Sequence, residues 1–347
     1  MTDARPNAPR RGRRRRWGIR LLLLLGACTA TLLLAEVALR VFDLYAPEAR
    51  AWPGEFENRV SATFEADATV GWRMRAGLDQ VIETEGGPIR VLSDANGRRT
   101  GPDRRAPSAA AHTVVLAGDS FVWGMGVEWA DTLAGRLEAR FDAVRVENLA
   151  QPGFGVDQIV LSVEHQGLPL APALVVVGIY PHDLDRSLTA WRDDLGFEKP
   201  TFRLDAGALV PLTPADRPSG LADFVARRSR IAGLWQRAER NLGFRFGVGP
   251  WWALNEALLD RLRACTSAAG CRLVLVHVPL HAWRPFDALT DWAARHGVPL
   301  VDPVREDPVE PAGIYFEPAG HLNAAGHRYL TELLVRRLER EGVRLGG

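Results

Sequence analysis

The sequence predicts an α/β fold built on a doubly wound sheet of five parallel strands, and two observations lead to this prediction. Apolar, β-branched runs recur along the chain, at residues 113–117, 144–149, 174–179, 272–278 and 298–301. Unbroken apolar runs are typical of strands buried on both faces, as in a parallel sheet covered by helices. Segments with the apolar spacing of helices separate these runs, and such alternation is the pattern of βαβ units.

The expected helices each show an apolar stripe at helical spacing; they are residues 131–141, 156–167, 252–268 and 323–341. In the first, Leu133, Leu137 and Phe141 fall on one face, and Asp131 is expected to begin the helix. In the last, Asn323 is expected to cap the N-terminus. Strands and helices in this order predict a flavodoxin-like arrangement.

The composition excludes several classes of protein and of site. With 347 residues, 47% hydrophobic and 24% charged, the chain has an ordinary globular composition and ample length for a core. Residues 1–20 hold eight arginines and one aspartate, a net charge of +7, whereas the whole chain has a net charge of +1. Residues 21–347 therefore carry a net charge of −6, which excludes a nucleic-acid-binding body. Three cysteines cannot form a disulfide framework; Cys265 and Cys271 are expected to stay unpaired, with a disulfide as the alternative. Without a three-ligand cluster, a phosphate loop or a dinucleotide-binding glycine motif, we predict no metal and no cofactor.

The first forty residues carry the pattern of a membrane anchor. Arg10–Arg16 is nearly all basic, and Leu21–Ala35 is an unbroken apolar run that ends at Glu36. A bilayer span needs about 20 apolar residues, and residues 17–41 supply it when the flanking arginines reach the interfaces. The sequence thus predicts a basic cytoplasmic tail (1–16), a single transmembrane helix and an extracytoplasmic, periplasmic body.

Two other interpretations remain open for this region. A signal peptide could be cleaved near residues 27–30, and a lipoprotein could be modified at Cys28. Both would leave the apolar residues 32–39 at the new N-terminus, so the uncleaved anchor is favoured.

The body is expected to have two parts. Residues 42–108 are predicted to form a juxtamembrane segment with short β elements, including a hairpin of residues 80–83 and 89–92. Residues 109–347 are predicted to form the α/β domain, with an insertion of about residues 186–250 after the third strand. Because ligands bind outside the carboxyl ends of such strands, the insertion is a candidate lid or substrate-recognition element. The alternative is a surface excursion without a role.

Three motifs carry chemistry because of where they fall in the predicted fold. Ser120 follows the first strand in a Gly-Asp-Ser tripeptide, where its hydroxyl faces the crevice of the sheet. Gly153 follows the second strand in Gln-Pro-Gly-Phe-Gly, where a backbone N–H can approach a ligand closely, as an oxyanion hole requires. His321 precedes the last helix in Gly-His-Leu-Asn-Ala-Ala-Gly-His and offers the serine a base.

In this order the three motifs resemble those of the SGNH (GDSL) hydrolase superfamily, and in particular its membrane-anchored bacterial branch. The likeness covers roughly residues 70–345. It implies that Ser120 is the nucleophile and that His321 is the base. It also implies an oxyanion hole formed by the N–H groups of Ser120 and Gly153 and by the residue at position 182.

Two positions depart from the family's pattern. His182 stands where the family has its oxyanion-hole asparagine, and a histidine can still donate one N–H. Pro318 and Ala319 occupy the positions of the family's acid. Glu317 is therefore expected to orient His321, with a backbone carbonyl and a Ser-His dyad as the alternative.

The resemblance implies a serine esterase or an O-acyltransferase that acts on short acyl esters, often acetyl groups on an envelope polysaccharide. Water would accept the acyl group in the first case, and a glycan hydroxyl in the second. A catalytically degenerate module that binds a glycan or serves as a scaffold is the alternative, because His182 and Ala319 replace family residues.

Overall fold

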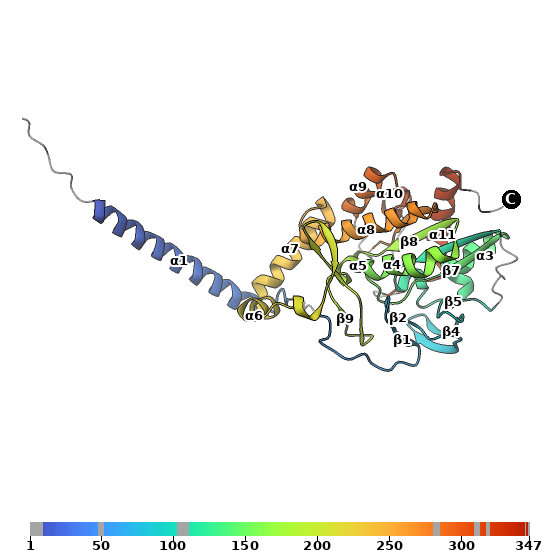
Figure 1. Cartoon of the computed structure of the whole chain (residues 1–347), viewed down its shortest axis with the longest axis horizontal. Coiled ribbons are helices and arrows are strands. Elements are labelled where there is room, and N and C mark those ends of the chain that lie inside the picture. Colours follow the sequence, from blue (N-terminus) through green and yellow to red (C-terminus); the bar gives the residue numbers. More distant parts are fainter. Residues whose placement is uncertain are drawn as a thin grey trace, which may run out of the picture. The chain divides into compact units, whose positions relative to one another are not determined.

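The computed structural model describes residues 10–47, 52–102, 111–279, 285–308, 313–316, 320–343 and 345, without the side chains of residues 10–15 and 222. The chain divides into two compact units (Figure 1). The first contains residues 1–49 and 218–238, and the second contains residues 50–217 and 239–347.

The second unit is built on an eight-stranded sheet in the order β14-β13-β8-β6-β7-β5-β4-β3. Its strands are β3 (Asp79–Thr84), β4 (Gly87–Ser93), β5 (Arg99–Thr100), β6 (His112–Ala117), β7 (Val144–Asn148), β8 (Leu174–Ile179), β13 (Arg272–His277) and β14 (Leu300–Val301). The strands from β14 to β7 are parallel, as the apolar runs predicted, and their order is that of a flavodoxin-like sheet.

The prediction of a purely parallel, five-stranded sheet is wrong at one edge. Strands β5, β4 and β3 continue the sheet beyond β7 in antiparallel pairing, so the sheet is mixed. The hairpin expected from residues 80–83 and 89–92 is present as β3 and β4. Local alternation predicts such a hairpin, but it does not tell which sheet the hairpin joins.

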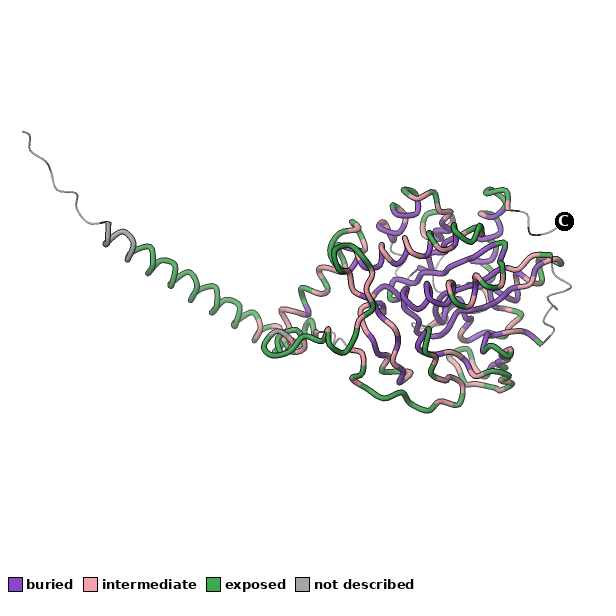
Figure 2. Tube along the Cα trace, viewed as in Figure 1, coloured by how far each residue is buried: buried purple, intermediate pink, exposed green. Residues whose placement is uncertain are grey.

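Helices cover both faces of the parallel strands. Successive residues of a strand point to opposite faces of the sheet, so each strand contributes apolar side chains to both layers. Val115 and Val175 belong to one buried cluster, and their neighbours Val114 and Val176 belong to another. The first cluster includes side chains of α4 (Val156–Ser162), α8 (Pro250–Ala268) and α9 (Asp287–His296). The second includes those of α2 (Ser120–Trp123), α3 (Leu133–Arg140) and α11 (Ala324–Arg340). Figure 2 shows the buried residues gathered along the strands and the inner helix faces.

The helix starts test two sequence predictions. Asn323 caps α11, because its side chain accepts the N–H groups of Ala325 and Gly326 at 2.9 and 3.0 Å. The predicted start of α3 is wrong: Thr132 is the cap, with its hydroxyl accepting the Gly135 N–H at 3.0 Å. Asp131 instead ends a short 3₁₀ turn before the helix.

Smaller elements surround the sheet. They are β1 (Phe64–Asp67), β2 (Gly71–Met74), β9 (Trp191–Arg192), β10 (Phe197–Glu198), β11 (Phe202–Asp205), β12 (Ala208–Pro211), α5 (Pro181–Arg186) and α10 (Pro303–Glu306). The predicted insertion therefore contains two short hairpins, β9–β10 and β11–β12. Cys265 and Cys271 are free thiols, as expected.

The first unit contains α1 (Arg10–Val41), α6 (Leu221–Arg228) and the start of α7 (Arg230–Phe246). Within α1, residues 16–41 are almost entirely exposed, and their most apolar 18-residue stretch has a mean hydropathy of 2.2. Among the described residues, this is the one helix that is long and apolar enough to cross a membrane. Its length and composition are typical of a membrane anchor and also of a signal sequence.

Candidate active site

Ser120 lies where β6 ends and the short helix α2 begins. Gly118 lets the chain turn here, because a Cβ atom at this position would lie 2.5 Å from a methyl group of Val122. Asp119 caps α2, and its carboxylate accepts the Phe121 N–H at 3.0 Å. Ser120 is consequently the first residue of α2, at the carboxyl edge of the parallel strands, and it is 6% exposed.

His321 reaches Ser120 from the loop before α11. Its Nε2 lies 2.7 Å from Ser120 Oγ, although 201 residues separate the two in the chain. A β-bridge between Tyr315 and Leu322 and the cap at Asn323 fix this loop. The structure thus brings together the serine and the histidine that the sequence motifs indicate.

The carboxylate beside His321 belongs to Glu85, which the sequence motifs do not indicate. Glu85 Oε1 accepts the backbone N–H of His321 at 2.6 Å and lies 2.6 Å from its Nδ1. Glu317, which the sequence predicted in this position, lies outside the described residues. The only sequence signal for Glu85 is a Glu-Gly-Gly turn between two short strands, 236 residues before His321.

Glycines let the β3–β4 turn approach His321. Glu85 and Gly86 form the two-residue loop of this hairpin. A Cβ atom on Gly86 would lie 2.3 Å from the carbonyl oxygen of Gly126 and 2.6 Å from the ring of Phe316. No larger residue fits without displacing the turn, so Gly86 sets how closely Glu85 comes to the histidine.

The series Glu85, His321, Ser120 has the geometry for general base catalysis. When Nδ1 of His321 donates to the carboxylate, Nε2 carries no proton and accepts the Ser120 hydroxyl. Such a histidine can take the hydroxyl proton as the oxygen attacks a carbonyl carbon, and the carboxylate stabilises the imidazolium that forms. The side chains of His321 and Glu85 are 27% and 32% exposed, so the series is open to solvent on one side.

Gly153, the predicted oxyanion-hole residue, lies in a loop held next to Ser120. Its φ of 81° is in the left-handed region, which favours glycine. Arg186 connects the two loops: its Nη1 donates to Asp119 Oδ2 at 2.9 Å and to the Phe154 carbonyl at 3.2 Å. One guanidinium therefore fixes the residues that adjoin both Ser120 and Gly153.

Arg186 also neutralises a second buried carboxylate. Its Nη1 donates to Asp183 Oδ1 at 2.7 Å. Burial, and then the charge of Asp119, raise the pKa of Asp183 well above its usual value. The same two causes raise the pKa of Tyr180 to about 12. Tyr180 therefore stays protonated at neutral pH and cannot serve as the base.

His182, the other predicted oxyanion-hole residue, is exposed on α5. Its Nδ1 lies 3.2 Å from Asp185 Oδ2, and its ring centroid lies 5.3 Å from that of Tyr180. Within the described part of the chain, no hydrogen bond, ion pair or ring contact joins His182 to Ser120 or His321. Its role as a donor to the oxyanion stays a prediction.

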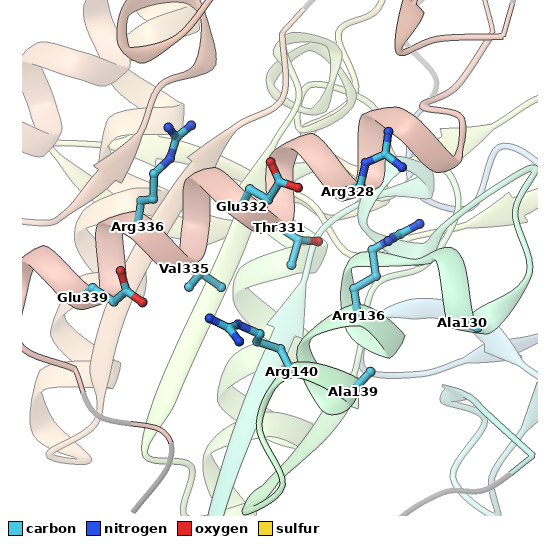
Figure 3. A pocket seen from close by; sticks show the side chains of 10 residues that line it. All are labelled: Ala130, Arg136, Ala139, Arg140, Arg328, Thr331, Glu332, Val335, Arg336 and Glu339. Carbon is cyan, nitrogen blue, oxygen red and sulfur yellow. The ribbon is translucent and has the colours of Figure 1, made fainter.

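Two further observations delimit the site. Among the described residues, no group of three or more His, Cys, Asp and Glu side chains could hold a metal ion. A surface hollow of about 640 Å³ lies between α3 and α11, with Arg136, Arg140 and Arg328 on its walls (Figure 3). Ser120 and His321 do not line this hollow, so it is separate from the candidate active site.

No protein-family model and no curated protein matches this chain. Among solved structures, that of TesA is 15% identical over 66% of this chain and 98% of its own, with a TM-score of 0.41. A catalytic mutant of Axe2, an acetylxylan esterase from Geobacillus stearothermophilus, is 15% identical over 69% and 98%, with a TM-score of 0.40. A lipolytic protein of the G-D-S-L family from Veillonella parvula is 12% identical over 66% and 100%, with a TM-score of 0.38. Each of these three matches covers about two thirds of this chain.

Proposed function

We propose that this protein is a membrane-anchored serine esterase or O-acyltransferase that acts on short acyl esters, those of an extracytoplasmic glycan in particular. The observation that carries the proposal is the contact of Ser120 Oγ with His321 Nε2 at 2.7 Å, with Glu85 on the opposite nitrogen at 2.6 Å. A nucleophile, a base and a group that orients the base are the minimum set for acyl transfer through a covalent intermediate.

The reaction follows from the positions of these three side chains. Ser120 Oγ attacks the ester carbonyl, and its proton passes to Nε2 of His321. The imidazolium then protonates the departing alcohol, which leaves an acyl group on Ser120. Water or a sugar hydroxyl, deprotonated by the same nitrogen, attacks the acyl-serine and restores the free enzyme. We assign the N–H groups of Ser120 and Gly153 to the tetrahedral oxyanion, with His182 as the third donor.

The acid in this proposal differs from the one that the sequence predicts. Glu85 takes the role expected of Glu317, because its carboxylate contacts both the Nδ1 and the backbone N–H of His321. The short acyl group and the glycan come from the family resemblance of the motifs. The anchor and the periplasmic placement of the body come from the charge and hydropathy of residues 1–41.

Covalent labelling tests the nucleophile. The full chain in detergent is treated with a fluorescent fluorophosphonate, which reacts with an activated serine. We expect the wild-type chain to be labelled and the Ser120→Ala variant to stay unlabelled, with Ser162→Ala as a matched control that keeps its label. Equal labelling of wild type and Ser120→Ala would overturn the assignment of Ser120, and absence of label in both proteins would favour the degenerate binding module.

A further inference from the structure

Apolar side chains face outward on α6 and at the start of α7, in residues 218–238, here called the α6–α7 segment. On α6, Leu221, Phe224 and Val225 are 77%, 54% and 44% exposed, and their spacing places them on one face. On α7, Trp235 is 71% exposed. Such a concentration of large exposed apolar residues marks a surface that another phase or molecule covers.

The polar residues of this segment are mainly basic. It holds four arginines and one aspartate. The guanidinium of Arg228 lies 4.7 Å from the ring centroid of Phe224, and that of Arg237 lies 5.8 Å from the ring of Tyr45, just after α1. Apolar and aromatic residues interspersed with arginine are typical of helices that lie in the headgroup region of a bilayer.

Glu36 ties the α6–α7 segment to the C-terminal part of α1. Its carboxylate accepts the N–H groups of Arg230 and Ile231 at 3.0 and 3.1 Å and the hydroxyl of Ser229 at 2.9 Å. It thus satisfies backbone donors at the first turn of α7, which have no partner inside the helix. Arg40 adds a second tie, donating to the Arg228 carbonyl at 2.7 Å.

Backbone packing brings α7 close to the end of α1. A Cβ atom on Gly233 would lie 2.1 Å from the carbonyl oxygen of Tyr45, so only glycine allows this approach. The α6–α7 segment is therefore packed where the apolar span of α1 ends, about one helical turn beyond Glu36. A bilayer that holds α1 has its polar interface at this level.

We propose that the α6–α7 segment lies in the membrane interface, with its apolar side chains in the acyl boundary and its arginines at anionic phospholipid headgroups. This placement rests on one part of the proposed function, namely that α1 is retained as a membrane anchor. It also explains why a carboxylate stands near the end of the apolar span: Glu36 caps α7. Cleavage of α1 would remove this cap.

Depth-dependent fluorescence quenching tests this placement with the full chain. The chain is reconstituted in vesicles of equal parts phosphatidylcholine and phosphatidylglycerol. In two parallel samples, some lipids carry a nitroxide near the headgroup end or near the methyl end of the acyl chain. An environment-sensitive dye is attached to one cysteine at a time, in a background in which the other cysteines are replaced. The labelled positions are Phe224→Cys, Trp235→Cys, the exposed Val81→Cys of β3 and the native Cys28 of α1.

We expect the dye at positions 224 and 235 to be quenched at least about threefold more than at position 81. Quenching at Cys28, with positions 224 and 235 at the level of position 81, would overturn the interfacial placement and leave the anchor intact. Absence of quenching at Cys28 by either nitroxide would overturn the anchor and the placement together. Fluorophosphonate labelling of each variant reports whether the catalytic unit is folded.

Discussion

At the scale of single residues, Glu85 holds His321 by two contacts of 2.6 Å, one to Nδ1 and one to the backbone N–H. Glu85→Gln keeps the size of the side chain but removes the charge that stabilises the imidazolium. We expect hydrolysis of p-nitrophenyl acetate to slow by about 10²–10⁴. Glu83→Gln, on the adjoining strand β3, is the control and should retain wild-type turnover, because among the described residues no hydrogen bond or ion pair joins Glu83 to His321. Unchanged turnover in Glu85→Gln would show that Glu85 does not orient the base.

The three members of this series differ in how far the sequence predicts them. Ser120 and His321 stand beside strand and helix ends that local patterns locate, so their meeting follows from the topology of a parallel sheet. Glu85 stands on an antiparallel hairpin whose place in the sheet depends on pairing across β5 and β7. No local pattern encodes that pairing, which is why the sequence favours Glu317, a residue much closer in the chain to His321.

His327 gives a pH-dependence at the same scale. It is buried, its Nδ1 accepts the Leu133 N–H at 3.3 Å, and burial, followed by the charge of Arg99, lowers its pKa from 6.5 to about 3. Between these values the unfolded chain binds a proton at this residue and the folded chain does not. The free energy of unfolding therefore falls as the pH falls from 6.5 toward 3.

The size of this effect can be measured by substitution. From pH 7 to pH 5, His327 should lower the free energy of unfolding by about 2 kcal/mol. His327→Asn retains an acceptor for the Leu133 N–H but does not titrate. In urea unfolding of the chain in detergent, the variant should lose about 2 kcal/mol less than wild type over this interval. Identical losses in the two proteins would mean that His327 of the folded chain takes up its proton over the same pH range as in the unfolded chain.

At the scale of elements, a buried ion pair fixes the start of the insertion to helix α4. Lys199, the only lysine of the chain, contacts Asp157 of α4, and both side chains are fully buried. Lys199→Met should lower the free energy of unfolding by about 3–5 kcal/mol, because it leaves the Asp157 carboxylate buried without a cation. Urea unfolding in detergent measures this loss.

The double variant separates charge from packing. Lys199→Met combined with Asp157→Leu removes both ionic groups, and it should recover most of the lost stability. A double variant no more stable than Lys199→Met would assign the loss to packing around the insertion. A loss of stability in Lys199→Met would show that the start of the insertion is part of the folded unit, and an unchanged free energy of unfolding would show that it is not. The result therefore bears on the candidate role of the insertion as a lid.

The same scale shows where sequence patterns suffice. The five parallel strands follow from short runs rich in β-branched residues that are separated by helical segments, since length and β-branching distinguish a buried strand from a buried helix. The start of α3 does not follow so directly. Asp131 and Thr132 are both good capping residues, and only the three-dimensional chain shows that the Thr132 hydroxyl meets the Gly135 N–H.

At the scale of the whole molecule, the chain combines an apolar helix with an α/β unit that carries the candidate active site. The charges beside the helix predict on which side of the membrane this unit lies. The arginines that precede the apolar span of α1 should stay in the cytoplasm, and the body should be exported. Alkaline phosphatase, which is active only after export, is fused after Phe42 in one fusion protein and after Arg16 in a second. We expect activity from the fusion after Phe42 alone, because only this fusion follows the complete apolar span.

A charge-reversed variant makes this test specific. Replacing the arginines at positions 10–16 by glutamate removes the positive charge that holds the N-terminus in the cytoplasm. The fusion after Phe42 should then lose most of its activity, since the helix inserts in the opposite orientation or not at all. An inactive fusion after Phe42 with the native arginines would place the body in the cytoplasm, where an extracytoplasmic glycan is out of reach of Ser120.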